Sequence, residues 1–302
     1  FEKGETAGEQ YPEREGIGER GEELQGAEIV YGVLQMTFRP DLLIGKTALV
    51  TGGGTGIGRG LSLALAAHGC DVAIISRTAA HLEQTSGDIE ALGRRSLAVA
   101  ADVRDPAAID EAVGQTVAAL GRLDILVNNA AGNFLCLAEN LSPNGFGAVV
   151  DIDLKGTFHM SKAVLPHLKA TGGTVLNISA TLHYVGTAAQ LHVSAAKAGV
   201  DALTRVLAVE WGQYGIRVNG IAPGPVDQTE GARRLLVGTS RERAVKSTPL
   251  GRLGGIADVS DAALFLCSEA AAFITGVTLV VDGGLWLASR SLVDEDAKNV
   301  EE

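Results

Sequence analysis

The stretch Thr51-Gly52-Gly53-Gly54-Thr55-Gly56-Ile57-Gly58 decides the fold, because it joins an apolar run to an amphipathic pattern. Residues 46–51 (KTALVT) predict a buried strand, and residues 57–68 predict a helix. Glycines let the backbone turn tightly and approach a ligand that a Cβ would repel. The helix N-terminus then offers free N–H groups and a positive dipole end to a pyrophosphate. A glycine-rich turn without a ligand is the alternative, but the position between strand and helix favours a dinucleotide site.

The same alternation of apolar runs and helical patterns continues along the chain. Such alternation indicates parallel strands joined by right-handed crossovers. The predicted fold is a single α/β, Rossmann-type doubly wound parallel sheet with helices on both faces, which binds ligands at the carboxyl ends of its strands. The predicted strands are residues 46–51, 72–76, 96–101, 123–127, 174–179, 216–221 and 277–282, and the predicted helices are residues 57–68, 81–92, 107–120, 142 to about 168, 190–214, 229–243 and 256–268.

Composition excludes several classes of protein. The 302 residues are 46% apolar and carry a net charge of −11, which argues against nucleic-acid binding. A membrane helix needs a run of about 18 apolar residues, and the sequence has no apolar run of that length, so we expect no membrane partner. Three cysteines far apart give neither a disulfide framework nor metal-ligand spacing. We therefore expect no metal and a reducing compartment.

The two ends of the chain differ from its middle. Residues 1–35 are rich in Glu and Gly and predict an acidic flexible tail, residues 36–290 predict one domain, and residues 291–302 predict an acidic C-terminal tail. The last residues, Asn299-Val300-Glu301-Glu302, do not match a peroxisomal S-K-L-like signal. We expect a cytoplasmic location in a bacterium or in the cytosol, and a peroxisomal one if the chain is truncated.

Cofactor preference is indicated after the second predicted strand. An acidic residue there would hold a ribose 2′-hydroxyl and repel a 2′-phosphate. The residues are instead Ser76-Arg77, and a hydroxyl beside a cation suits the 2′-phosphate of NADPH. The alternative, which we favour less, is that Arg77 is an exposed loop residue without a ligand. Asp102, after the third strand, is expected to contact the adenine, with helix capping as its alternative role.

Three further motifs follow the glycine-rich stretch: Asn128-Asn129-Ala130-Ala131-Gly132, Ser194-Ala195-Ala196-Lys197 and Pro223-Gly224. Together the four resemble the short-chain dehydrogenase/reductase family over about residues 41–286. The resemblance implies a homo-oligomer, commonly a tetramer, and a catalytic Lys197 that binds the nicotinamide ribose. The cofactor contacts that we expect are Gly52, Gly53, Gly54, Thr55, Gly56, Ile57, Gly58, Arg77, Asp102, Val103, Asn129, Ala130, Lys197, Pro223, Gly224, Pro225, Val226 and Thr229.

The sequence departs from that family at three catalytic positions. Val193 stands where the family has its tyrosine, Ala180 where it has its serine, and Asp153 where it has its asparagine. Reducing a ketone makes an alkoxide that needs a proton donor beside the oxygen, and Val193 cannot supply one. Interconversion of alcohols and ketones is therefore disfavoured.

One subgroup shows the same changes. Residues 130–136 (AAGNFLC), 151–153 (DID), 207–211 (LAVEW) and 223–225 (PGP) resemble the peroxisomal-type 2,4-dienoyl-CoA reductases. This resemblance implies NADPH-dependent reduction of a 2,4-dienoyl-CoA to a 3-enoyl-CoA in unsaturated fatty acid β-oxidation. It also implies that Asp153 and Lys197 form the catalytic pair, which we expect to hold a proton-delivering water. The charge of Lys197 is expected to favour ionised Asp153, and a structural ion pair is the alternative.

Other possibilities remain open from the sequence. Tyr184, after the fifth predicted strand, is a second candidate acid. A 2-enoyl-CoA reductase, a 3-oxoacyl-thioester reductase and a non-catalytic NADPH-binding sensor or scaffold are the rival functions. Residues 231–245 predict a flap over the acyl chain. The acyl-CoA contacts implied by the resemblance are Arg77, Arg104, Phe134, Ser142, Pro143, Asn144 and Arg234, with Arg233 as the alternative to Arg234.

Overall fold

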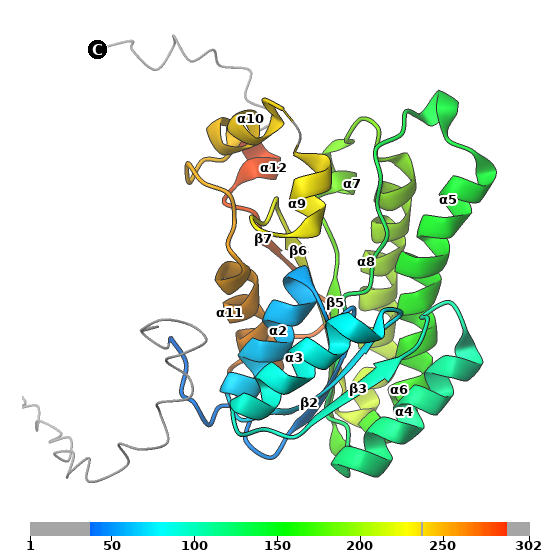
Figure 1. Cartoon of the computed structure of the whole chain (residues 1–302), viewed down its shortest axis with the longest axis vertical. Coiled ribbons are helices and arrows are strands. Elements are labelled where there is room, and N and C mark those ends of the chain that lie inside the picture. Colours follow the sequence, from blue (N-terminus) through cyan, green and yellow to red (C-terminus); the bar gives the residue numbers. More distant parts are fainter. Residues whose placement is uncertain (1–36, 237, 289–302) are drawn as a thin grey trace, which may run out of the picture. The chain divides into compact units, whose positions relative to one another are not determined.

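A computed structural model describes residues 37–236 and 238–288, so both predicted tails lie outside the described residues. Seven parallel strands form one sheet in the order β3-β2-β1-β4-β5-β6-β7 (Figure 1). The order reverses between β1 and β4, and this switch point is where doubly wound sheets bind nucleotides. The predicted fold class is confirmed. The strands are β1 (Thr47–Thr51), β2 (Asp71–Ser76), β3 (Ser96–Ala100), β4 (Ile125–Asn128), β5 (Thr174–Ile178), β6 (Arg217–Pro223) and β7 (Thr278–Val281).

Helices cover both faces of the sheet (Figure 1). Helices α2, α3 and α11 lie on one face, and α4, α5, α6 and α8 lie on the other. The helices are α2 (Gly56–Ala67), α3 (Ala79–Ala91), α4 (Pro106–Leu120), α5 (Pro143–Val150), α6 (Gly156–Thr171), α7 (Leu182–Val185), α8 (Leu191–Trp211), α9 (Glu230–Leu235), α10 (Ser240–Ser247), α11 (Ile256–Cys267) and α12 (Leu285–Ala288). None of the helices in the described ranges is long and apolar enough to cross a bilayer.

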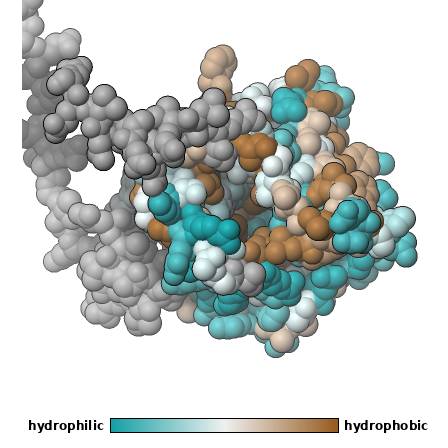
Figure 2. All heavy atoms as spheres, turned by 90° about the horizontal axis from the view of Figure 1, so that it is seen from above, coloured by the Kyte–Doolittle hydropathy of each residue, from teal (hydrophilic) through white to brown (hydrophobic). Residues whose placement is uncertain are grey.

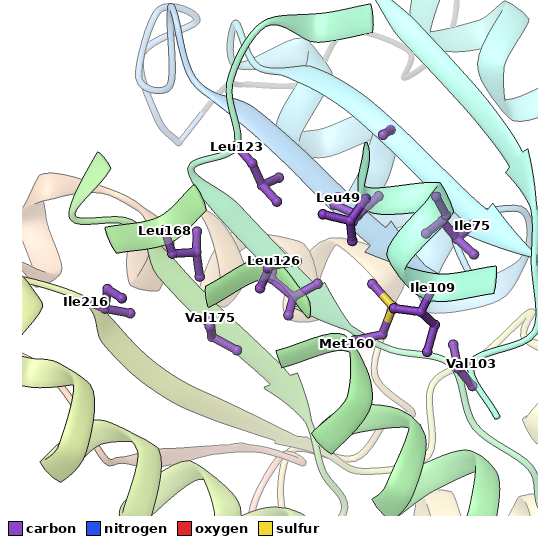
Figure 3. Close-up of a cluster of buried hydrophobic side chains, with 14 of the residues drawn as sticks. Leu49, Ile75, Val103, Ile109, Leu123, Leu126, Met160, Leu168, Val175 and Ile216 are labelled. Carbon is purple, nitrogen blue, oxygen red and sulfur yellow. The ribbon is translucent and has the colours of Figure 1, made fainter. Parts of the chain in front are cut away.

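The core lies between the sheet and the helices. All five residues of β1 are buried, as expected for a central parallel strand with helices on both faces. Leu49, Leu126 and Val175 project from neighbouring strands toward Met160 and Leu168 of α6 (Figure 3). This packing fixes the carboxyl ends of β1, β4 and β5 relative to one another, and those ends carry the site.

The helix predicted over residues 142 to about 168 is interrupted. A π-helical turn, η2 (Asp151–Lys155), separates α5 from α6. A π turn inserts one residue into the helical register, and such turns are frequent at functional sites. The residues of η2 follow no special pattern of glycine or proline, so the sequence did not indicate this break.

The predicted flap also differs in detail. Residues 229–243 were expected to form one helix, but α9 ends at Leu235 and α10 begins at Ser240. Gly238 between them has φ of 59°, which a single helix cannot accommodate. The short helices α7 and α12 were not predicted, because four residues are too few to show a helical period.

Candidate active site

The glycine-rich turn between β1 and α2 forms a cradle in which the neighbouring atoms leave no space for side chains at several glycines. A Cβ on Gly58 would lie 2.2 Å from the Gly52 carbonyl oxygen and 2.4 Å from Asn129 Nδ2. Gly56 has φ of 53°, which favours glycine. Thr55 precedes α2 without capping it through its side chain, so the N–H groups of the first turn remain available to an anion. The turn therefore fits the pyrophosphate of a dinucleotide.

Thr51 holds this cradle against the end of β4. Its hydroxyl oxygen accepts hydrogen bonds from the backbone N–H groups of Asn129 and Ala130, both at 2.9 Å. The Asn129 side chain donates to the Thr51 carbonyl at 2.9 Å. Asn129 and Ala130, which we predicted to contact the cofactor, thus also shape its cradle. Thr51 begins the glycine-rich stretch but was not predicted to be a site residue, although a hydroxyl at the end of a buried strand signals such a role.

The adenosine end of the cradle carries the predicted cations. Arg77 is exposed after β2 and makes no hydrogen bond or ion pair within the described residues. Arg104 donates to both carboxylate oxygens of Asp102, at 2.6 to 3.0 Å, and this hydrogen bonding lowers the pKa of Asp102. The structure therefore joins two residues for which separate ligands were predicted. Val103 between them is buried in the core beside Gly156.

The carboxyl end of β6 forms the opposite wall. Pro223 ends this strand, and the backbone of Pro225 and Val226 pairs with Gly254. A Cβ on Gly224 would lie 2.7 Å from Cβ of Asp282, so only glycine fits there. Thr229 caps α9 through its side chain, and a Cβ on Gly56 would meet it at 3.9 Å. Two segments far apart in the sequence are thus brought together around one cleft.

Asp153 and Lys197 face each other at the centre of the site. Lys197 Nζ lies 3.3 Å from Asp153 Oδ2, and the two residues are 6% and 0% exposed. Lys197 also donates to the Ile178 carbonyl at 2.7 Å, and Asp153 Oδ1 accepts from the Gly132 backbone N–H at 2.7 Å. These bonds join β5, α8, η2 and the loop after β4, and they fix both charged groups in place.

Burial and Lys197 act in opposite directions on the pKa of Asp153. Burial raises the pKa of Asp153 above its usual value, although Lys197 and the Gly132 N–H act to lower it. The charge of Lys197 favours the ionised form, as expected, but the cost of desolvating the carboxylate is larger, so the pKa of Asp153 is raised overall. Asp153 therefore holds a proton more readily than an ordinary aspartate.

Val193, at the position of the family tyrosine, is part of a hydrophobic cluster. Val193 is 3% exposed and packs with Val149 and Ala196 between α5 and α8. His192, the preceding residue, is fully buried, and its ring lies 4.3 Å from that of Phe134. His192 could not be singled out from the sequence, because a lone histidine at a helix start carries no spacing signal.

The surroundings of Tyr184 do not favour its role as the acid. Its hydroxyl donates to Asp201 Oδ2 at 2.8 Å, and His183 Nε2 lies 2.9 Å from the same oxygen. Burial and the Asp201 carboxylate raise the pKa of Tyr184 well above its usual value. Asp201 also accepts from Thr278 of β7, so the cluster anchors α7 against α8 and β7.

Residues predicted to contact an acyl-CoA lie around the mouth of the site. Phe134 is 40% exposed, and a Cβ on Gly145 of α5 would lie 3.2 Å from its ring. Ser142 caps α5, which begins at Pro143. On α9, Arg234 pairs with Glu230, and Arg233 is exposed. Seen from above, this end of the molecule is hollowed, with hydrophobic residues on one side of the hollow and hydrophilic residues near its rim (Figure 2).

Comparison with known proteins agrees with the fold and identifies the family. A family model described as enoyl-(acyl carrier protein) reductase matches residues 52–286. The chain belongs to the short-chain dehydrogenase/reductase family, and it is an oxidoreductase that uses a nicotinamide cofactor.

Several individual proteins of that family are similar to this chain over most of its length. The chain is 49% identical over 261 residues to a peroxisomal 2,4-dienoyl-CoA reductase of Danio rerio. The matched region covers 85% of this chain and 87% of that protein. It is 43% identical over 246 residues to a Bacillus subtilis protein named as a 2,4-dienoyl-CoA reductase that produces (2E)-enoyl-CoA, covering 80% and 97% of the two chains. A solved short-chain alcohol dehydrogenase of Sinorhizobium meliloti is 36% identical, with a TM-score of 0.79, covering 82% and 99%.

Proposed function

We propose that this protein reduces 2,4-dienoyl-CoA thioesters to 3-enoyl-CoA with NADPH, as a step in the β-oxidation of unsaturated fatty acids. The buried Asp153–Lys197 pair carries this proposal, since it occupies the catalytic centre while Val193 replaces the family tyrosine. The names of the Danio and Bacillus relatives support the substrate class.

The cofactor proposal depends on Arg77. A guanidinium placed after β2, with no hydrogen bond or ion pair among the described residues and only a longer-range attraction to Asp102, suits a 2′-phosphate better than a 2′-hydroxyl. The pyrophosphate would lie at the N-terminus of α2, and Lys197 would hold the nicotinamide ribose. The reduced nicotinamide supplies a hydride to C5, the far end of the conjugated system.

The chain then has to deliver one proton to carbon. Addition of hydride at C5 spreads negative charge through the dienyl group to the thioester oxygen, and protonation at the α carbon leaves a 3-enoyl-CoA. The acid therefore need not sit beside a carbonyl oxygen, so a tyrosine at position 193 is not required. A water held by Asp153 and Lys197 gives its proton to the α carbon and regains one from the Asp153 carboxyl.

The raised pKa of Asp153 supports this assignment. A carboxyl group whose proton is retained to higher pH can act as a proton source under conditions in which an exposed aspartate is ionised. Lys197 keeps the ionised product of that step stable until Asp153 is reprotonated. The pair thus both supplies the proton and limits the cost of giving it up.

Further contacts are proposed around this centre. Arg104 and Arg234 would bind CoA phosphates. To do so, Arg104 would leave its ion pair with Asp102, and Arg234 would leave its ion pair with Glu230. Phe134 would line the acyl channel. A tetramer is proposed from the family resemblance. The Danio relative is peroxisomal by name, so peroxisomal and cytoplasmic locations are both proposals, which imaging of the tagged protein in its source cells distinguishes.

Substrate screening tests this function. NADPH oxidation is followed at 340 nm, a wavelength at which only the reduced nicotinamide absorbs, with 2,4-decadienoyl-CoA, 2-decenoyl-CoA and 3-oxodecanoyl-CoA as substrates. We expect turnover with the dienoyl-CoA alone. Turnover with the 2-enoyl- or 3-oxoacyl-CoA instead would contradict the substrate assignment. Binding of NADPH without oxidation by any of them would favour the sensor.

A further inference from the structure

His192 has unused hydrogen-bonding capacity at the start of α8. The residue is 0% exposed, and neither Nδ1 nor Nε2 makes a hydrogen bond of good geometry within the described residues, although the Phe134 backbone lies close enough to act on the ring. Buried polar groups in native proteins are almost always paired, because an unpaired one costs about 1–3 kcal/mol. At least one nitrogen of this buried ring is therefore left for a partner that is not part of the chain.

The surroundings of His192 orient the ring and keep it neutral. The ring lies 4.3 Å from the Phe134 ring, at an interplanar angle of 49°. Burial lowers the pKa of His192, although Asp153 and the Phe134 backbone act to raise it. A neutral imidazole has one donor and one acceptor nitrogen, so it can both give and receive a hydrogen bond.

Few other titratable groups face the start of α8. Helix α5, which packs against it, contains none. The turn η2 contributes Asp153, while its Asp151 and Lys155 pair with each other. Cys136 lies in the loop that carries Phe134. From α7, His183 and Tyr184 both bond to Asp201, and on α8 itself Lys197 pairs with Asp153.

Asp153 has a complementary acceptor atom. Its Oδ2 forms the ion pair with Lys197 Nζ at 3.3 Å and accepts no hydrogen bond of good geometry, and Asn133 Oδ1, in the loop after β4, has no hydrogen-bond partner among the described residues. Asp153 Oδ2 can thus accept a further hydrogen bond, and the nearby imidazole can donate or accept one. A water molecule is the smallest ligand that pairs with all of these groups.

We propose that His192 is a positioning residue of the proton-delivery step, and that its imidazole orients the water that Asp153 and Lys197 hold. This inference deepens the proposed function and rests on it. In the step, water gives a proton to the α carbon and Asp153 replaces it, while His192 changes hydrogen-bond partners without changing its own protonation. An imidazole that fixes the direction of the water O–H favours transfer to carbon.

Three variants test the role of His192. His192→Phe keeps an aromatic ring against Phe134 and removes both nitrogens, whereas His192→Gln keeps a donor and an acceptor. His167→Phe is the matched control, since it makes the same change on α6, about 20 Å along the helix axis from Asp153. Each folded variant is assayed with NADPH and 2,4-decadienoyl-CoA between pH 5 and 9, and its NADPH Kd is measured by fluorescence.

We expect His192→Phe to lower kcat about tenfold or more, with KM and the NADPH Kd changed less than about twofold. Its pH profile should shift, because removing the imidazole changes the surroundings of Asp153. His192→Gln should recover kcat to within about threefold of the parent, and His167→Phe should match the parent. A purely structural role would instead change KM and stability and leave the pH profile unmoved.

Other outcomes of the same experiment would contradict this role of His192. Parental kcat and pH profile in His192→Phe, or an equal loss in His167→Phe, would overturn the inference while leaving the proposed function intact. If His192→Phe does not fold, His192→Gln decides, and a kcat more than about tenfold below that of the parent in this variant overturns the role. A parent protein that does not oxidise NADPH with the dienoyl-CoA contradicts the proposed function and, with it, this role for His192.

Discussion

Lys197 Nζ lies 3.3 Å from Asp153 Oδ2 in surroundings that leave the aspartate 0% exposed and the lysine 6% exposed. A buried ion pair is weak evidence for stability, because desolvation offsets much of the attraction between its charges. Its placement at the carboxyl ends of the strands, where sheets of this type bind their ligands, instead favours a catalytic role.

Replacing Asp153 should remove the proton source and preserve the cofactor site. Asp153→Asn is expected to lower kcat about a hundredfold or more, with the NADPH Kd changed less than about threefold. In the parent, activity should fall as pH rises through the raised pKa of Asp153, since the protonated form acts. That alkaline limb should be absent from the residual activity of the variant.

Tyr184→Phe is the control for this experiment. Its hydroxyl bonds to Asp201, so the change should lower thermal stability, by about 1 kcal/mol, and leave kcat near that of the parent. If Tyr184→Phe is the slow variant and Asp153→Asn is not, the acid is Tyr184.

Arg77 should determine cofactor preference. Arg77→Glu places a negative charge where the 2′-phosphate is expected, so the affinity for NADPH should fall at least about tenfold while that for NADH rises. Isothermal titration with each dinucleotide measures both effects. Lys162→Glu makes a similar charge reversal at an exposed position of α6 and should leave both affinities unchanged. Equal losses in the two variants would indicate a general effect of charge.

Gly58 should be irreplaceable. In Gly58→Ala the new Cβ would lie 2.2 Å from the Gly52 carbonyl oxygen, so the cradle must open. We expect a destabilisation of about 1–3 kcal/mol and a loss of NADPH binding. Gly114→Ala on α4, where a Cβ would meet nothing within 4 Å, should instead stabilise the protein by about 0.5–1 kcal/mol. Thermal denaturation with and without NADPH compares the two, and equal behaviour would contradict the steric account.

Asp71 should make stability depend on acid pH. Burial raises the pKa of Asp71, but hydrogen bonds from Arg95 and the charges of Arg94 and Arg95 outweigh it, and the pKa is lowered overall. A lowered pKa contributes stability above the unfolded value of about 4 that is lost as pH falls through the folded value. Asp71→Asn should thus cost about 2 kcal/mol at pH 7 and progressively less below about pH 4. A deficit independent of pH would show that the ion pairs do not cause it.

The fold could be predicted because its signals are local and repeated. Buried runs such as residues 47–51 and the glycine-rich turn follow from periodicity and from the conformations that glycine allows. The placement of Asp153 depends on the π turn η2, which changes the register of one helix without a sequence signature. The role of His192 depends on what surrounds it after folding, and the protonation of Asp153 depends on burial that no neighbour in sequence reveals.

The central claim is that hydride enters at C5 and a solvent-derived proton enters at the α carbon. Reduction of 2,4-decadienoyl-CoA with cofactor deuterated at the transferred position, and separately in D₂O, tests it by NMR of the product. We expect a 3-enoyl-CoA with cofactor deuterium at C5 and solvent deuterium at C2. A 2-enoyl-CoA, as the name of the Bacillus relative describes for that protein, with solvent deuterium at C4, would contradict the account of where the Asp153 water delivers its proton.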